Sequence, residues 1–302
     1  MKKLKFVLAL PGDNNYLQEQ EAVAKATAER LGAELQVLNA KSDPILQSQQ
    51  LLEIVQSKSA PRPDGILVEL VSATGLPRVA EAAVAAGIGW VISNTRVDYL
   101  GALRRTAKVP AFTVSQDHLE IGRLQGRQVG AILPNGGALL YVRGPSTNFL
   151  SSQRTEGMES AKPKNVQVKV LKTQWTGENA YNTIGSWLAL SSTRAADTQM
   201  ISSQNTDFIL GAKRAFKTNA QEPERTKWLS LPCTGAGTAS QAKPLVDKGV
   251  LVAAVITSLT MDTALEMLVK ALKGGTQPPE HTTVPASSYP SLEELAKKHS
   301  SK

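Results

Sequence analysis

The amino-acid sequence predicts an α/β fold of two Rossmann-like lobes, each built on its own sheet of parallel strands. Short apolar runs alternate with amphipathic stretches along almost the whole chain, and strands that alternate with helices form βαβ units. Nine or more such runs are present, which exceeds what one compact sheet usually holds. The length of 302 residues also favours two lobes.

The first part of the chain contains five expected strands and four expected helices. Gly32 and Gly87 are suitable helix ends, and Pro44 suits the first position of a helix. A polar, basic stretch up to Lys108 separates the fourth strand from the fifth. We expect strands at 4–10, 33–40, 64–70, 88–94 and 109–114, and helices at 15–31, about 44–55, 76–86 and 117–133.

The second part repeats the alternation and ends in a different pattern. Beyond Gly274, an extended piece at about 281–288 precedes a short charged helix at 291–299. We expect strands at 137–144, 166–172, 198–204, 227–232 and 250–257, and helices at 149–160, 178–192, 206–218, 238–248 and 260–273.

The composition is that of an ordinary globular protein. Hydrophobic residues make up 41% and charged residues 20%, which excludes a disordered chain. The net charge of +8 is scattered, with clusters only at the two ends, and no helix-turn-helix pattern precedes the first strand. We therefore expect no nucleic-acid partner.

Disulfide, metal and cofactor chemistry have little support in the sequence. The single cysteine, Cys233, excludes an intramolecular disulfide, and the three histidines lie far apart without metal-ligand spacing. The loop around Gly235 lacks the ending of a phosphate loop, and no dinucleotide or nucleophile-elbow motif is present. We expect no metal, no cofactor and no catalytic activity.

The first residues leave two cellular locations open. Met-Lys-Lys-Leu-Lys resembles the start of a signal peptide, but only FVLAL follows before Pro11, and an export signal needs about 7–15 apolar residues. No apolar stretch reaches the roughly 20 residues that span a membrane, so no membrane insertion is expected. Either the protein is cytoplasmic or a leader has been removed.

Several segments resemble one known family in their order and spacing. The chain resembles the type I periplasmic sugar-binding proteins, the group of the ribose-binding protein and the lactose-repressor effector domain. The resemblance extends to about Gly274. The matching segments are DNNY (13–16), PDGILV (63–68), AGIGWVI (86–92) with NTR (94–96), QRTEGM (153–158), QN (204–205) with GA (211–212), and GVLVAAV (249–255).

The resemblance implies a hinged clamp that closes on a small ligand. An N-terminal lobe of residues 1–113 and 259–281 and a C-terminal lobe of residues 114–258 and 282–302 are implied. Three crossovers, near 112–117, 257–259 and 282–286, would join them. It further implies a periplasmic monomer that binds a sugar or sugar-like molecule, either for an ABC-type importer or, alternatively, as an effector domain that signals through a sensor protein.

The same resemblance, with simple chemistry, selects candidate ligand-binding residues. Flat aromatic rings stack on the C–H faces of sugars, and polar groups replace the water on their hydroxyls. Tyr16 and Trp175 are the expected stacking rings, with capping of the first helix as the alternative for Tyr16 and surface packing as the alternative for Trp175. Asn205 is equally consistent with helix capping. The full set is Asp13, Asn14, Tyr16, Asn94, Arg96, Phe149, Ser152, Trp175, Asn205, Thr206, Gly237 and Thr257.

Four of these positions depart from the family pattern. Thr206 and Gly237 stand where the family has acids, Thr257 where it has glutamine, and Ser152 where it has arginine, while Arg154 matches a more structural arginine. Small groups thus replace strong polar contacts. We expect ribose, glucose and galactose to bind weakly, and a larger or less hydroxylated ligand to be preferred.

Overall fold

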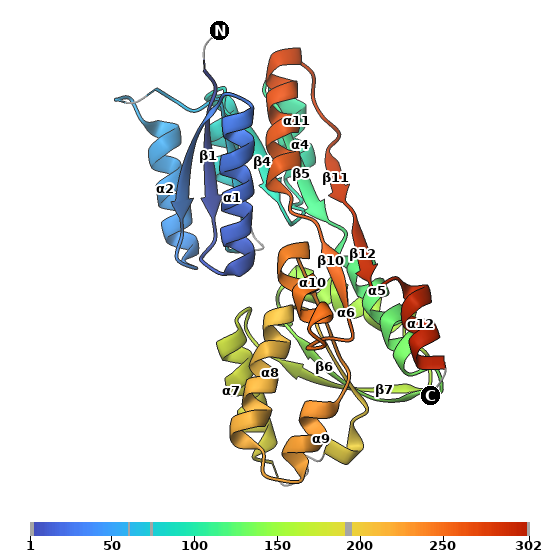
Figure 1. Ribbon diagram of the computed structural model, residues 1–302. Coiled ribbons are helices and arrows are strands. Elements are labelled where there is room, and N and C mark those ends of the chain that lie inside the picture. Colours follow the sequence, from blue (N-terminus) through green and yellow to red (C-terminus); the bar gives the residue numbers. More distant parts are fainter. Residues whose placement is uncertain (1–2, 60, 73–74, 191–194, 301–302) are drawn as a thin grey trace. The chain divides into compact units, whose positions relative to one another are not determined.

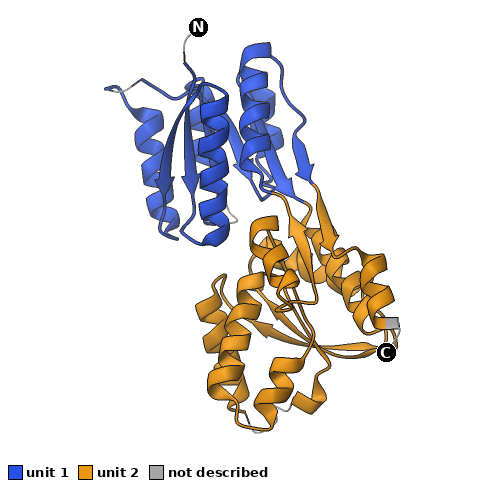
Figure 2. Cartoon of the chain, in the orientation of Figure 1, with its two compact units in different colours: residues 1–116, 259–284 blue, residues 117–258, 285–302 orange. Residues whose placement is uncertain are grey.

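The computed structural model describes residues 3–59, 61–72, 75–190 and 195–300. The chain forms two compact units (Figure 2): unit 1 comprises residues 1–116 and 259–284, and unit 2 comprises residues 117–258 and 285–302. The chain passes from one unit to the other three times. Each unit holds a six-stranded sheet, so the predicted α/β class with two lobes is confirmed.

Unit 1 is a parallel sheet with helices on both faces (Figure 1). The strand order is β11-β5-β4-β3-β1-β2, and every pairing is parallel. The strands are β1 (Lys5–Leu10), β2 (Glu34–Asn39), β3 (Gly65–Glu69), β4 (Gly89–Ser93), β5 (Ala111–Gln116) and β11 (His281–Val284). The helices are α1 (Asn15–Arg30), α2 (Pro44–Gln56), α3 (Pro77–Ala85), α4 (Leu100–Thr106) and α11 (Met261–Gly274).

Alternation along β1 explains the two layers of helices in unit 1. Successive strand side chains point to opposite faces of a sheet. Val7 and Ala9 join a core with apolar residues of α2, α3 and α4. Phe6 and Leu8 join a second core with α1 and α11. Strands that are buried on both faces have continuous apolar sequences, and for this reason they could be predicted readily.

Unit 2 repeats the architecture with one antiparallel edge strand. The order is β12-β10-β9-β8-β6-β7, and only the β12–β10 pair is antiparallel. The strands are β6 (Gly137–Arg143), β7 (Val166–Lys172), β8 (Met200–Ser203), β9 (Cys233–Gly237), β10 (Ala253–Thr257) and β12 (Ala286–Tyr289). The helices are α5 (His118–Ile132), α6 (Phe149–Ala161), α7 (Gly177–Leu188), α8 (Thr206–Asn219), α9 (Glu224–Ser230), α10 (Ala239–Asp247) and α12 (Leu292–Ser300). A short 3-10 helix covers Ala195–Asp197.

The expected strand at 227–232 is wrong. Most of that segment belongs to helix α9, and the strand is β9, which follows it. Trp228 is buried and stacks on Phe216, with ring centroids 5.0 Å apart, so the apolar run anchors a short helix to the core. Strand β9 was not predicted from the sequence because it is made of small residues. A Cβ atom at Gly235 would lie 3.2 Å from the Thr206 Cα, so larger side chains would collide with the start of α8.

Two further differences concern helices. The basic stretch before Lys108 contains α4, whose Leu100 and Leu103 are buried in unit 1, although no element was expected there. Helix α7 ends at Leu188, and the last two residues of the expected helix at 178–192 lie outside the described residues.

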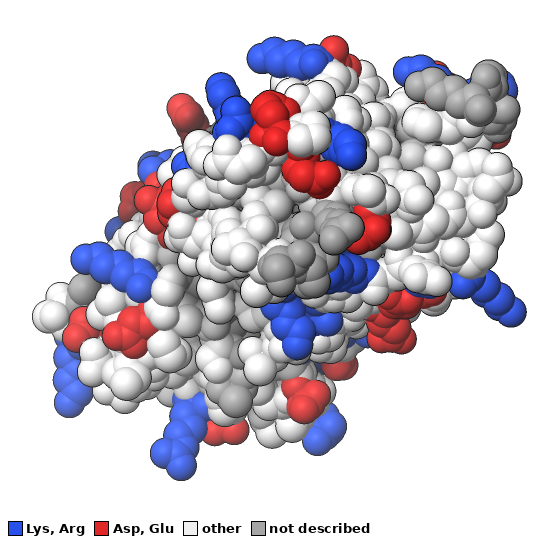
Figure 3. Space-filling view, turned by 90° about the horizontal axis from the view of Figure 1, so that it is seen from below, with Lys and Arg blue, Asp and Glu red and all other residues white. Residues whose placement is uncertain are grey.

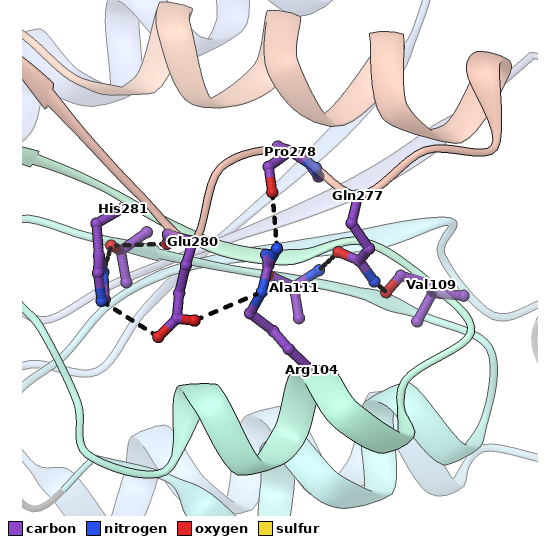
Figure 4. A network of polar contacts seen from close by, with 8 residues as sticks. Arg104, Val109, Ala111, Gln277, Pro278, Glu280 and His281 are labelled. Carbon is purple, nitrogen blue, oxygen red and sulfur yellow. Dashed lines mark hydrogen bonds and ion pairs between the residues drawn. The ribbon is translucent and has the colours of Figure 1, made fainter.

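The segment that leads from α11 to β11 is held to the sheet of unit 1 by a polar network (Figure 4). Gln277 donates to the Val109 carbonyl (2.6 Å) and accepts from the Ala111 N–H (3.1 Å). Arg104 donates to the carbonyls of Pro278 (2.8 Å) and Ala111. These contacts fix where β11 begins beside β5, at the edge of the sheet.

On the face that Figure 3 displays, Lys and Arg side chains are interspersed with Asp and Glu rather than gathered in one patch. Among the helices of the described residues, none is both long and apolar enough to cross a membrane.

Candidate functional site

The carboxyl ends of four parallel strands in unit 1, with the residues that follow them, bring together polar side chains. Ligands of open α/β sheets bind at this edge, because the loops after the strands meet there. Tyr16 lies in the first turn of α1, just after β1, Glu69 ends β3, Asn94 follows β4, and Gln116 ends β5.

The Tyr16 hydroxyl is the centre of this polar group. Side-chain amide nitrogens of Gln20, Asn94 and Gln116 lie 2.6 Å, 2.6 Å and 3.2 Å from the hydroxyl oxygen. Gln20 continues the network to Thr260 Oγ1 at 2.7 Å, at the start of α11. Tyr16 and Asn94, which the sequence suggested separately as ligand-binding residues, are thus in direct contact in the structure.

Asn94 reaches this position through an unusual backbone conformation. Its φ of +59° is in the left-handed region, which asparagine tolerates better than most residues. The residue is 4% exposed, and its amide also donates to Glu69 Oε2 at 3.1 Å. Asn94 is therefore a bridge between the carboxylate at the end of β3 and the phenol of α1.

Glu69 is the functional candidate that sequence reasoning missed. It is only partly exposed, and burial raises the pKa of its carboxyl group to about 7, although the hydrogen bond from Asn94 opposes this shift. Within the described part of the chain, no ion-pair partner of Glu69 is present. The available signal was an acidic residue that closes an otherwise apolar strand.

The other unit 1 candidates lie at the surface of the same edge. Asn14 caps α1 by accepting from the Leu17 N–H (3.0 Å), which is the structural alternative for this residue type. Asp13 accepts from Gln18 Nε2 at 2.8 Å and is exposed. Arg96 is exposed as well. These three do not take part in the contacts between Tyr16, Asn94 and Glu69.

In unit 2, Trp175 follows β7 and packs on its own unit. Its ring stacks on Phe208 with centroids 5.7 Å apart and planes inclined by 29°. It also covers Gly144, where a Cβ atom would lie 2.5 Å from the indole ring. The indole is half-buried, so one part of its surface remains open to solvent.

Neutral polar groups gather where β8 and β9 end. Asn205 caps α8 by accepting from the Asp207 N–H at 2.8 Å. Thr206 is 1% exposed, and its Oγ1 has no hydrogen-bond partner among the described residues. The Nε2 atom of Gln241 is also buried and has no hydrogen-bond partner among the described residues. A Cβ atom at Gly237 would lie 3.0 Å from Thr206 Oγ1, so the glycine leaves this hydroxyl its space. Buried groups of this kind call for a partner such as water or a ligand hydroxyl.

The remaining unit 2 candidates are distributed over three elements. Phe149 opens α6 and is 41% exposed, and Ser152 is exposed and donates to the Ser146 carbonyl (3.2 Å). Thr257 ends β10 and is buried beside β12. Arg154 donates to the Gln204 carbonyl (2.8 Å), in line with the structural role inferred for it.

Arg143 is a second residue that the sequence did not single out. It ends β6, and its Nε donates to Ser151 Oγ at 3.2 Å. Its Nη2 is buried and has no partner among the described residues. The guanidinium therefore faces α6 of its own unit.

No three His, Cys, Asp or Glu side chains of the described residues are placed to hold a metal ion together. Cys233 is buried, its thiol donates to the Leu231 carbonyl, and burial raises the pKa of the thiol to about 11. A thiol of this kind is inert.

Replacing Tyr16 by phenylalanine tests the role of the hydroxyl. The ring stays, but three amide groups lose a common hydrogen-bond partner, so we expect the free energy of unfolding to fall by about 1–3 kcal/mol. Thermal unfolding followed by circular dichroism measures this. Tyr181→Phe is the matched control, because its hydroxyl lies at the surface, where it meets Thr218 (3.3 Å) and Asn219, and should contribute under about 0.5 kcal/mol. Equal unfolding temperatures for the two variants would contradict the prediction.

Comparison with known proteins agrees with this fold. Residues 6–276 match the model of the family described as periplasmic binding protein domain. No curated protein sequence matches the chain.

Solved structures resemble the chain over its whole length. A galactofuranose-binding protein is 19% identical, with 99% of each chain covered and a TM-score of 0.80. An ABC transporter solute-binding protein from Bacillus halodurans, with bound myo-inositol, is 18% identical and covers 99% of this chain and 98% of its own (TM-score 0.78). One from Actinobacillus succinogenes, with bound D-allose, is 18% identical and covers 98% and 100% (TM-score 0.79).

Proposed function

Because the chain belongs to the family of periplasmic binding protein domains, we propose that it is a non-enzymatic solute-binding protein for a sugar or polyol. The observation that carries the proposal is the polar network around the Tyr16 hydroxyl. It lies at the carboxyl ends of the strands, in a fold that it shares with structures holding myo-inositol and D-allose.

The chemistry of this network suits a ligand with many hydroxyl groups. Side-chain amides offer donors and acceptors, and can replace the water molecules that surround each hydroxyl. In unit 2, Thr206 and Gln241 add neutral groups, and the half-buried Trp175 offers an aromatic face. The ligand-binding residues selected from the sequence remain part of this proposal, with Glu69 added to them.

We further propose that the protein works outside the cytoplasm and passes its ligand to an ABC permease. Membership of the periplasmic family supports this location. The solute-binding proteins from Bacillus halodurans and Actinobacillus succinogenes are described as parts of ABC transporters, which supports the kind of partner.

A thermal-shift screen with sugars and polyols tests the proposed function. A ligand present at about 100 times its dissociation constant should stabilise the protein by about 2.7 kcal/mol. Calorimetry then gives the affinity, and mass spectrometry of the recovered ligand should show it chemically unchanged. The proposal fails if no sugar or polyol stabilises the protein, or if the ligand is converted.

A further inference from the structure

Glu69 is the feature of the proposed ligand site that a neutral sugar leaves unexplained. Among the described residues, its carboxylate meets one protein donor, the amide of Asn94 at 3.1 Å from Oε2. The neighbouring groups in the network, Tyr16, Gln20 and Gln116, are all neutral. A negative charge is thus placed among neutral groups at the carboxyl edge of the sheet.

A partly buried carboxylate without a cation is unfavourable. Removing a charge from water costs free energy unless an opposite charge compensates for it. The rise of the Glu69 pKa has this cause. Several other acids of unit 1 do have cations beside them: Glu34 is 3.2 Å from Lys5 Nζ, and Glu266 is 2.5 Å from Arg30 Nη2. Glu69 differs from these in having no cation among the described residues.

We propose that the ligand is an amino sugar or aminopolyol, whose ammonium group pairs with the Glu69 carboxylate. This inference rests on the proposed sugar-binding function. An ammonium group supplies the missing positive charge and three hydrogen-bond donors, and hydrogen bonds between charged groups are about twice as strong as those between neutral groups. The hydroxyls of the same ligand are left to the amides around Tyr16.

Arg143 in unit 2 is a charge that argues in the opposite direction. The Arg143 guanidinium is half-buried and has no acidic partner in the described part of the chain. Its Nε, however, is bound to Ser151 and its Nη2 is covered by protein. We therefore assign ligand charge recognition to Glu69, and an acidic sugar becomes the probe that tests this assignment.

The experiment compares matched sugars by calorimetry at pH 7.2. The probes are 2-amino-2-deoxy-, 3-amino-3-deoxy- and 6-amino-6-deoxy-D-glucose and the corresponding galactose derivatives, with glucose, galactose, N-acetylglucosamine and glucuronate as partners without the positive charge. We expect at least one amine to bind about tenfold or more tightly than its hydroxyl parent. The N-acetylated sugar and the acid should bind no better than the parent.

Two variants test whether Glu69 is responsible for the preference for amines. Glu69→Gln keeps the shape of the side chain but removes its charge, and should reduce the amine-to-parent ratio to within about twofold. Glu53→Gln makes the same change at an exposed position of α2 and should leave the ratio as in the wild type. A ratio that persists in Glu69→Gln overturns the inference.

The outcomes separate this inference from the function on which it rests. Neutral sugars that bind as tightly as the amines, or an acid that binds best, overturn the inference and leave the proposed function intact. Failure of every sugar and polyol to bind overturns the proposed function itself, and the inference with it.

Discussion

Replacing Gly157 by alanine is expected to destabilise unit 2 by about 3 kcal/mol or to prevent its folding. Gly157 lies in α6, and an added Cβ atom would lie 2.1 Å from the Leu119 carbonyl oxygen of α5. The contact is reciprocal, since a Cβ atom at Gly122 of α5 would lie 2.2 Å from the Arg154 carbonyl oxygen. The two helices therefore meet backbone to backbone, and neither obstacle is a flexible side chain that can move aside.

The sign of this effect is opposite to that expected from helix propensity. Alanine is favoured over glycine inside a helix by about 1 kcal/mol, so without the packing constraint the variant would be more stable. Thermal unfolding followed by circular dichroism decides between the two. Gly130→Ala is the control in α5, because its Cβ atom would meet only the Pro163 side chain at 3.3 Å. A Gly157→Ala protein as stable as Gly130→Ala would refute the packing argument.

The sequence predicts the architecture well because unit 1 and unit 2 bury their central strands on both faces. Such strands are continuous apolar runs, and the helices between them keep their own period, so element type and order were readable. The predicted strand at 227–232 was wrong for a local reason. A short apolar run has no clear period, and Trp228 uses it to anchor a helix, while β9 next to it consists of small residues.

The candidate site was predictable only in part. Loops after strands are the right place to search in an α/β fold, and Tyr16 and Asn94 were both selected from such loops. That their side chains contact each other depends on tertiary structure, including the left-handed backbone of Asn94. Glu69 was missed because its importance lies in what surrounds it. A carboxylate is unremarkable in a sequence, and only the fold reveals that it is partly buried and has no cation beside it among the described residues.

Glu69→Gln is expected to stabilise the ligand-free protein much more at pH 8 than at pH 5. In the folded protein the pKa of Glu69 is about 7, against 4.5 for an unperturbed glutamate. A carboxyl pKa that rises on folding favours the folded state while the group is protonated. This stability is present below pH 4.5 and is lost as the pH rises through 7. Glutamine does not ionise, so the variant does not suffer that loss.

The size of the effect follows from linkage between protonation and folding. Each pKa unit corresponds to about 1.4 kcal/mol, and after allowance for the partial exposure of Glu69 we expect a gain of roughly 2 kcal/mol at pH 8. That is a rise of about 4–8 °C in the unfolding temperature of unit 1. Residues that bind ligands are often unfavourable for stability, and Glu69 would be one of them.

Unfolding temperatures of the wild type, Glu69→Gln and Glu53→Gln at pH 5 and pH 8 provide the measurement. Other carboxyl groups change the stability of all three proteins with pH, so the informative quantity is the difference from wild type at each pH. For Glu69→Gln it should be small at pH 5, about a quarter of its value at pH 8, and for Glu53→Gln it should be near zero at both. A Glu69→Gln protein that is less stable than the wild type at pH 8 would mean that the carboxylate has a cationic partner in the folded chain. The case for an ammonium group on the ligand would then lose its physical basis, because the charge of Glu69 would already be compensated.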